Sequence, residues 1–260
     1  MSNKVLIYLG LWALLTLLEK FFPARVQPSV SPHSVTDAAC LFVNKLVLEP
    51  GFAALHTWLT LAVLEPYVPK HIFAEAIRDL PLAVKFLAAI FLLDLAQYLR
   101  HRLMHAWLWG FHATHHSAVE LRASVHWRLH PVDLAFLMVF DTAFLYVLGF
   151  PGGVIFLTQI FRALHNMWLH VNLNVDYGFL RKVFVSPNYH KWHHAKEKEA
   201  IDKNFADIFV FLDILGGTHY YPHDRKVEEF GCHGIANDAP LHSDYLGAML
   251  YPLERLKKPE

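Results

Sequence analysis

The chain has 260 residues, of which 55% are hydrophobic and 18% charged, and its mean hydropathy is +0.28. This composition is too apolar for an ordinary soluble domain and fits several membrane spans. Its 23 basic and 23 acidic side chains leave no net charge, so we expect no nucleic acid partner. The two cysteines, Cys40 and Cys232, form no CxxC motif, which argues against a thiolate metal site but leaves a disulfide between them open.

Five apolar segments predict an all-α integral membrane protein with about four or five membrane helices, each of which needs about 20 residues to cross the bilayer. In chain order the segments are Val5–Phe22, Gly51–Leu64, Leu80–Leu99, Val132–Phe150 and Val154–Val171. The first precedes a poor cleavage site, so it indicates an uncleaved span rather than a signal peptide. The second is short, and it is either re-entrant or extended upstream through Leu41–Leu48.

From about Val175 the chain becomes polar, which predicts a helical cap on the cytosolic side that holds part of the functional site. The sequence contains no internal repeat and no low-complexity tract. We therefore expect a single domain over residues 1–260. Its parts would be N-terminal membrane segments at 1–80, a histidine-rich core at 81–222 and a tail at 223–260.

Three histidine clusters hold eight of the chain's 19 histidines. Box one is His101 and His105, box two is His112, His115 and His116, and box three is His190, His193 and His194. Residues spaced i, i+3 and i+4 share one face of a helix, so each box can aim two or three imidazoles at one point. Imidazole is a common ligand of first-row transition metals, and eight imidazoles exceed the needs of one ion. The boxes therefore predict a dimetal site.

The order of the apolar segments brings the boxes to one face of the membrane. Box one should extend the third segment out of the bilayer, and box two should form a separate helix. The tight turn at Pro151–Gly153 makes the fourth and fifth segments a hairpin, which returns the chain to the same side at His170. Asp141 and Arg162, one on each arm, would form an ion pair across it. Arginines and lysines near the boxes predict that this face is cytoplasmic.

Two further histidines lie on the predicted metal side and are candidate ligands. His130 directly precedes the fourth segment, and His170 ends the fifth. His126 and His165 are more typical of hydrogen-bonded histidines at an interface or in a core. We expect the remaining histidines to be structural or on the surface, namely His33, His56, His71, His219, His223, His233 and His242.

A carboxylate near neutral imidazoles would orient their N–H groups. Asp94 is the main candidate, because an acid within an apolar segment is costly and usually functional. It precedes His101 by seven residues and so lies on nearly the same helix face. The alternative for Asp94 is an ion pair with Arg100 or Lys85. Weaker candidates for the orienting role are Asp133 and Asp202.

Other metal chemistries fit the boxes less well. Arg102 stands where the HExxH motif of zinc proteases requires its general-base glutamate. A haem takes two axial ligands, which would leave most of the histidines unexplained. The second hypothesis is a membrane metal transporter or sensor, but a transporter should carry ligands along a path through the bilayer, whereas the boxes gather on one face.

The boxes and their flanks resemble the fatty acid hydroxylase/sterol desaturase superfamily of membrane oxygenases. The resemblance runs from about residue 85 to residue 222 and rests on the order HxxxH, HxxHH, HxxHH together with flanking elements. These elements are Asp94, Tyr98 and Arg102 around box one, Phe111–Ser117, Arg128–Pro131, His170 with Asn172, Asn188–His194, Ile201–Phe205, and Leu212 and Asp213 with Gly217 and Thr218.

The resemblance implies a non-haem di-iron centre that uses O2 and two external electrons to oxidise a lipid C–H bond, by hydroxylation or desaturation. Such a bond has no acidic proton, so the cofactor has to carry the chemistry. The implied iron ligands are His101, His105, His112, His115, His116, His130, His170, His190, His193 and His194. The electrons would come from a separate partner, either cytochrome b5-like or a ferredoxin with its reductase. The lipid stays open, as do an ether-lipid monooxygenase and a carotenoid hydroxylase of the same chemistry.

Tryptophans cluster around the boxes. Trp109, Trp127 and Trp168 are candidates for lining the substrate mouth. Each could instead belong to the aromatic belt at a membrane interface. The sequence alone does not separate these two roles.

Overall fold

The structure is a computed structural model that describes residues 3–60, 62, 65 and 73–257. Within these residues all regular elements are helices, apart from two isolated bridges between extended segments. The predicted all-α class is therefore confirmed. The end of the second predicted segment, at residues 61, 63 and 64, lies outside the described residues, and so does His71.

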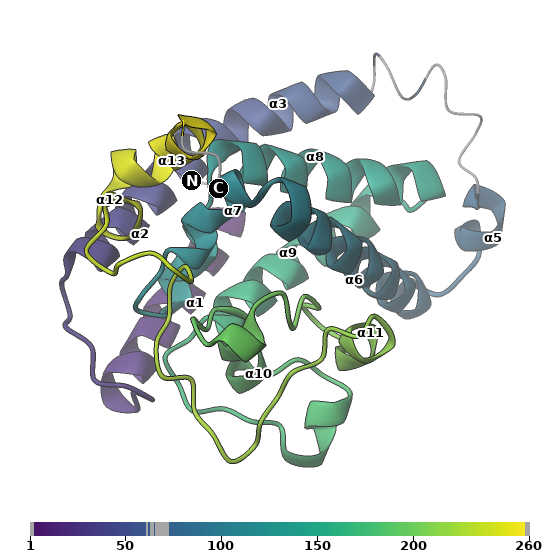
Figure 1. Cartoon of the computed structure of the whole chain (residues 1–260). Helices are drawn as coiled ribbons and strands as arrows, with labels where there is room; N and C mark the ends of the chain where they lie inside the picture. The colour runs from purple at the N-terminus through teal and green to yellow at the C-terminus, as the bar shows by residue number, and fades with distance from the viewer. Residues whose placement is uncertain (1–2, 61, 63–64, 66–72, 258–260) are drawn as a thin grey trace.

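Long helices form the body of the molecule (Figure 1). They are α1 (Asn3–Phe21), the continuous stretch α2 (Pro32–Phe42), η1 (Val43–Leu48) and α3 (Glu49–Leu59), then α6 (Leu82–Trp107), α8 (Pro131–Leu148) and α9 (Gly152–Leu169). Helix α6 packs against α8 and α9, α3 packs against α8, and α1 packs against α9. The shorter helices are α5 (Ala74–Arg78), α7 (Trp109–His116), η3 (Ala123–Trp127), η4 (Gly178–Lys182), α10 (Pro187–His193), η5 (Lys198–Ala200), α11 (Val210–Leu215), α12 (Pro240–Ser243) and α13 (Tyr245–Lys257).

Three stretches are long and apolar enough to cross a membrane, namely Pro32–Leu59, Leu82–Trp107 and Pro131–Leu148. They indicate a membrane protein. Helices α1 and α9, which we also expected to span, are not among the three, because each carries polar side chains such as Glu19 and Arg162. The expected count of four or five spans is therefore not confirmed, and three stretches meet the length and composition of a span within the described residues.

The predicted hairpin is present, and its two ends follow from local chemistry. Helix α8 begins with Pro131 at its first position, and Nδ1 of His130 accepts the N–H of Val132 at 3.1 Å. The helix ends at Gly149, whose φ of 96° is a left-handed conformation that glycine adopts without a steric penalty. Helix α9 then starts directly after Pro151 and returns along α8 and α6.

Buried charges hold this hairpin to α6. Arg162 on α9 forms an ion pair with Asp141 on α8, as predicted, and a second one with Asp207 at 3.2 Å. The guanidinium of Arg100 on α6 lies 3.8 Å from Asp141. All four side chains are nearly or fully buried. The two arginines on α6 and α9 are therefore compensated by the two aspartates, one on α8 and one in the loop before α11.

The second helix runs without a break through a π-helical turn. It begins at Ser31, whose side chain accepts the N–H of Ser34 and so caps the helix. In the π-helical turn η1, the side-chain amide of Asn44 donates to the carbonyls of Trp127 and Leu129 at 2.9 and 3.0 Å. The predicted segment is therefore extended upstream, and η1 lies at the level where α8 begins.

Part of the expected cap lies along α6. The ring of Phe91 on α6 is 6.1 Å from the rings of both Phe209 and Phe211. Three residues further along α6, Asp94 accepts the N–H groups of Ile208 and Phe209 at 3.1 and 2.8 Å. The polar segment after residue 175 is thus anchored to the side of this helix as well as to its end.

The Arg162 ion pairs predict a large effect on stability. Arg162→Met leaves Asp141 and Asp207 buried without their shared cation, so we expect the free energy of unfolding to fall by about 3–5 kcal/mol. Thermal unfolding of the purified chain, followed by intrinsic fluorescence, measures the effect. The matched control is Arg78→Met, since Arg78 is exposed on α5. Equal unfolding midpoints for the two variants would contradict the prediction.

Candidate metal centre

Nine histidine rings converge into two groups, and in each group the ligand atoms all lie within 4.8 Å of one another. Group A consists of His101, His105, His112, His116 and His193, and group B consists of His115, His170, His190 and His194. All of these side chains are buried except His105, which is partly buried. The hairpin brings His170, at the end of α9, to the same place as the three boxes.

Helix geometry explains why adjacent histidines serve different groups. Successive residues on a helix are rotated by about 100° around its axis. His115 and His116 at the end of α7 therefore point into groups B and A respectively. His194 and His193 at the end of α10 divide in the same way. The repeated HxxHH pattern thus supplies ligands to two sites at once.

In group A the Nε2 atoms face one another at ligand spacing. Nε2 of His101 lies 3.0 Å from Nε2 of His112, and Nε2 of His105 lies 3.1 Å from Nε2 of His116. Two nitrogens that bind one ion at about 2.1 Å, at right angles to each other, are about 3.0 Å apart. The buried Nε2 of His193 has no hydrogen-bond partner among the described residues.

Group B has the same spacing. Nε2 of His170 lies 3.2 Å from Nε2 of His115 and 3.1 Å from Nε2 of His190. Nε2 of His190 lies 3.2 Å from Nε2 of His194. Each group therefore has nitrogen atoms placed as they would be around one metal ion.

Acceptors at the opposite ring nitrogen fix the protonation of several rings. Nδ1–H of His101 donates to the carbonyl of Phe205 at 3.0 Å, and Nδ1–H of His193 donates to the carbonyl of Lys203 at 2.8 Å. Because a carbonyl only accepts, a neutral ring bonded in this way carries a lone pair on Nε2. This is the usual orientation of metal-binding histidines.

Two carboxylates have the same role, and both were the weaker candidates from the sequence. Asp202 accepts from Nδ1 of His105 at 3.0 Å, and Asp133 accepts from Nδ1 of His112 at 2.7 Å. The Nε2 lone pairs of His101 and His112 consequently face each other, which is repulsive unless a cation lies between them. The donor set of group A thus fits a metal ion.

Six of the imidazoles outside α6 are neutral at pH 7 because their pKa is lowered. Burial, followed by the proximity of other imidazoles, lowers the pKa of five of them well below its usual value, namely His115, His116, His190, His193 and His194. Burial also lowers the pKa of His170 to about 4. Neutral rings offer lone pairs to a metal without first releasing a proton.

Residues 86–218, just over half of the chain, match the family described as Fatty acid hydroxylase. The chain belongs to the fatty acid hydroxylase family. Over 262 residues it is 26% identical to an ornithine lipid hydroxylase of Rhizobium tropici, which covers 98% of this chain and 76% of that protein. It is also similar to alkylglycerol monooxygenases of Danio rerio (30% identical) and Homo sapiens (26%), each over 52% of this chain and 30% of the relative. No solved structure matches the chain.

Hydroxylases and monooxygenases are oxidoreductases, and this member of the fatty acid hydroxylase family is one as well. The matched residues contain all three boxes and His170, so they contain both histidine groups. Each of the two alkylglycerol monooxygenases shares less than a third of its own length with the chain. The similarity to those proteins therefore concerns one part of them.

The structure does not bring His130 to either group. Its Nδ1 caps α8, and its Nε2 lies 3.3 Å from the carbonyl of Met249, so both ring nitrogens have other contacts. Asp94 does not contact a histidine ring among the described hydrogen bonds, nor does it pair with Arg100 or Lys85. It accepts the backbone N–H groups of residues 207–209 and so anchors the loop that follows Phe205. Its effect on His101 is therefore indirect.

The three candidate tryptophans have different surroundings. Trp109 lines a cavity of about 760 Å³ next to group A, and its ring lies 5.1 Å from that of His105. Trp127 packs edge-on against Trp12 and lines a smaller cavity. The indole of Trp168 donates to the hydroxyl of Tyr177 at 2.6 Å and packs into the core around α1 and α9. The outer cavity, as we call the first, also contacts His116 and His193.

Sequence reasoning missed the backbone acceptors. The carbonyls of Lys203, Phe205 and Asn166 accept from His193, His101 and His170, the last at 2.6 Å. Every residue has a carbonyl, so no residue type marks these positions, although Asn166 stands one helical turn before His170. Nε2–H of His165 donates to the carbonyl of Asp207 at 2.9 Å, which matches the hydrogen-bonded role expected for this residue.

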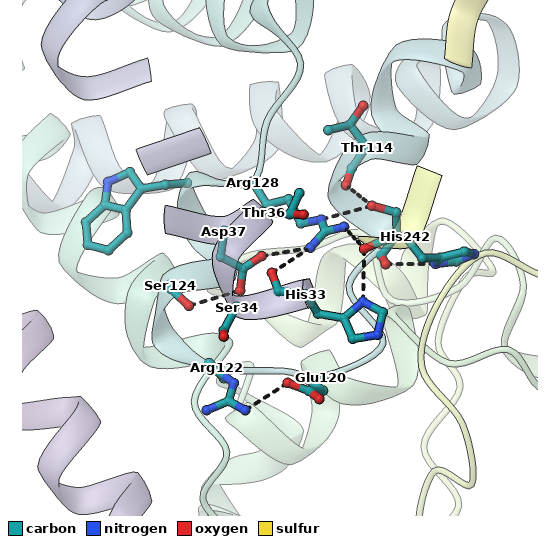
Figure 2. Close-up of polar contacts among 12 residues, drawn as sticks. His33, Ser34, Thr36, Asp37, Thr114, Glu120, Arg122, Ser124, Arg128 and His242 are labelled. Atoms are coloured by element: carbon teal, nitrogen blue, oxygen red, sulfur yellow. Dashed lines mark hydrogen bonds and ion pairs between the residues drawn. The ribbon is translucent and has the colours of Figure 1, made fainter. Parts of the chain in front are cut away.

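Arg128 joins box two to α2 and α12 (Figure 2). Its side chain is fully buried, and Nε donates to the hydroxyl of Ser117, directly after His116, at 2.9 Å. One terminal nitrogen donates to Asp37 on α2 at 2.9 Å, and the other donates to the carbonyl of His242 on α12. Nδ1 of His242 in turn contacts the carbonyl of Ser117 at 2.8 Å. The end of α7, which carries His115 and His116, is thereby fixed in place.

This network predicts the effect of replacing Arg128. Arg128→Met leaves Asp37 and several carbonyls buried without a donor, so we expect a loss of about 3–5 kcal/mol of stability and a lower metal content. Arg128→Lys should rescue only part of it, because an ammonium lacks the planar fork that reaches all of these acceptors. Unfolding midpoints and bound metal per chain measure both effects. Exposed Arg225 supplies the control, Arg225→Met, and a similar result for it would refute the network's role.

Proposed function

We propose that this chain is a di-iron membrane enzyme that oxidises a C–H bond of a lipid with O2. The observation that carries the proposal is the pair of histidine groups, in which Nε2 atoms face one another at 3.0–3.2 Å. In group A the Nδ1–H groups of His101 and His193 also donate to backbone carbonyls. Group A would hold one iron and group B the other. His130 is left out of the ligand set because it caps α8.

When bound, the iron ions would supply the activation of O2, which side chains alone do not provide. In a hydroxylation the lipid C–H bond, O2, two electrons and two protons become a C–OH group and water. The electrons would come from a separate cytochrome b5-like or ferredoxin-type partner.

The chain's own residues would bind and orient. Asp133 and Asp202 hold the rings of His112 and His105 by accepting hydrogen bonds from their Nδ1–H groups, and the carbonyls of residues 203 and 205 hold two more rings. Burial of eight of the nine rings excludes water from most of the site. A water-poor site limits side reactions of activated oxygen.

The relatives support a membrane lipid as the substrate. One is named an ornithine lipid hydroxylase and aligns with nearly the whole chain, which favours hydroxylation. A second candidate, oxidation of an ether lipid, is favoured by the alkylglycerol monooxygenases that match the region of the boxes. We propose one domain across the chain, with the histidine groups at its cytoplasmic face because cationic side chains cluster there.

Metal analysis tests the dimetal centre. Chain purified without oxygen should contain two iron ions by plasma mass spectrometry. Folded protein with all histidines intact and at most one metal ion per chain would overturn the proposal. Bound zinc alone would not count as iron, since histidine sites bind several divalent metals.

Single alanine variants separate the ligand sets. His193→Ala and His194→Ala should each lose one metal ion, from group A and group B respectively, and both should lose lipid oxidation. His130→Ala should keep two metal ions, although its helix cap is weakened. The control is His223→Ala, because His223 is exposed. Metal loss from His130→Ala equal to that from His193→Ala would contradict the assignment.

A further inference from the structure

Two small cavities approach the histidine groups from the side of the membrane helices. The inner cavity, of about 50 Å³, contacts rings of both groups, among them His101, His115 and His170. The lateral cavity, of about 170 Å³, lies between α1, η1, α8 and α9. Four lining residues are common to both cavities, His126, Leu129, Leu137 and Asn166, so the two adjoin. The outer cavity, by contrast, contacts rings of group A alone.

The wall of the lateral cavity is charged where an apolar helix would be expected. Lys45 lies on the π-helical turn η1 and Glu49 follows it as the first residue of α3, and their side chains pair at 2.5 Å. The ammonium of Lys45 also lies 4.4 Å above the ring centre of Tyr8 on α1. π-helical turns are frequent at functional sites.

The depth of this pair suits the head of a lipid. Asn44, next to Lys45, is bonded to the carbonyls of Trp127 and Leu129, just before α8 enters its apolar run. The pair therefore lies at the boundary between the cap and the apolar helices, where polar lipid heads reside. The lateral cavity, at about 170 Å³, is smaller than the roughly 300–1,000 Å³ of sites that enclose a whole small molecule. It therefore has room for a lipid head and not for acyl chains.

We propose that the lateral cavity binds the zwitterionic head of an aminolipid substrate, with its acidic group at Lys45 and its ammonium at Glu49. The cavity wall has one cation and one anion in this pair, and its third charge, Arg162, is already compensated by Asp141 and Asp207. A head without net charge matches this balance. The proposal rests on the proposed lipid oxidation and names its substrate class.

The adjoining inner cavity places the oxidised carbon close to the head. Asn166 lines both cavities, and its carbonyl accepts from His170 of group B at 2.6 Å. The ring of His126 also lines both, and no hydrogen bond of its nitrogens is found among the described residues. A head held at Lys45 would therefore present its nearest carbons to the metals, and carbons far down an acyl chain would stay in the bilayer.

Lipid binding to the full chain tests the proposal without requiring turnover. Native mass spectrometry in detergent would compare ornithine lipid, phosphatidylethanolamine and diacylglycerol as probes. We expect both aminolipids to bind more tightly than diacylglycerol, and Lys45→Met or the isosteric Glu49→Gln to weaken aminolipid binding by about tenfold or more. Lys85→Met is the control, since Lys85 contacts the carbonyl of Arg78 at the far end of α6.

Each alternative outcome overturns the proposal. Equal binding of diacylglycerol and the aminolipids would remove head recognition, and so would unchanged aminolipid binding in both single variants. In the double variant Lys45→Glu with Glu49→Lys the intrahelical pair is kept in its more favourable order. Full aminolipid binding by that variant would mean that the pair only braces the helix. The binding results do not depend on whether the chain oxidises the lipid. Failure of the proposed function would instead appear in the metal analysis and in assays of the oxidised product.

Discussion

The site depends on where the imidazole protons reside. A neutral histidine binds metal through Nε2 only when its single proton is on Nδ1, and an acceptor that faces Nδ1 holds the proton there. One short loop supplies three of these acceptors to group A, through the carboxylate of Asp202 and the carbonyls of Lys203 and Phe205. The loop contains no histidine, yet it determines which ring nitrogen of three group A histidines carries the proton.

The loop is held in a conformation that it would not adopt alone. Asp202 and Asn204 have φ values of 55° and 57°, in the left-handed region that is uncommon for residues other than glycine. The side-chain amide of Asn204 donates to the carbonyls of Tyr189 and Tyr220, and its oxygen accepts the N–H of Tyr220. Asp213 accepts the N–H groups of Phe205 and Ala206 from the other side. Buried polar groups outside the boxes thus maintain the geometry within them.

Residue spacing was sufficient to predict the convergence, since the HxxHH pattern and the turn at Pro151–Gly153 leave few ways to arrange the boxes. It was insufficient for His130 and Asp94. Histidine is not among the preferred residues at a helix start, so the cap of α8 was not evident beside Pro131. Asp94 accepts backbone N–H groups more than a hundred residues away, and every residue except proline carries such a donor. Contacts of this kind follow from the tertiary fold and not from the residue pattern.

The position of Arg128 has a consequence for biosynthesis. Membrane helices enter the bilayer in the order in which they are made, and α6 and α8 are made well before α12. Two of the carbonyls that bind Arg128, those of Leu241 and His242, belong to α12, more than a hundred residues later in the chain. Box two is thus secured only after α12 has been made. The two histidine groups therefore reach their final geometry after the helices that surround them have been inserted.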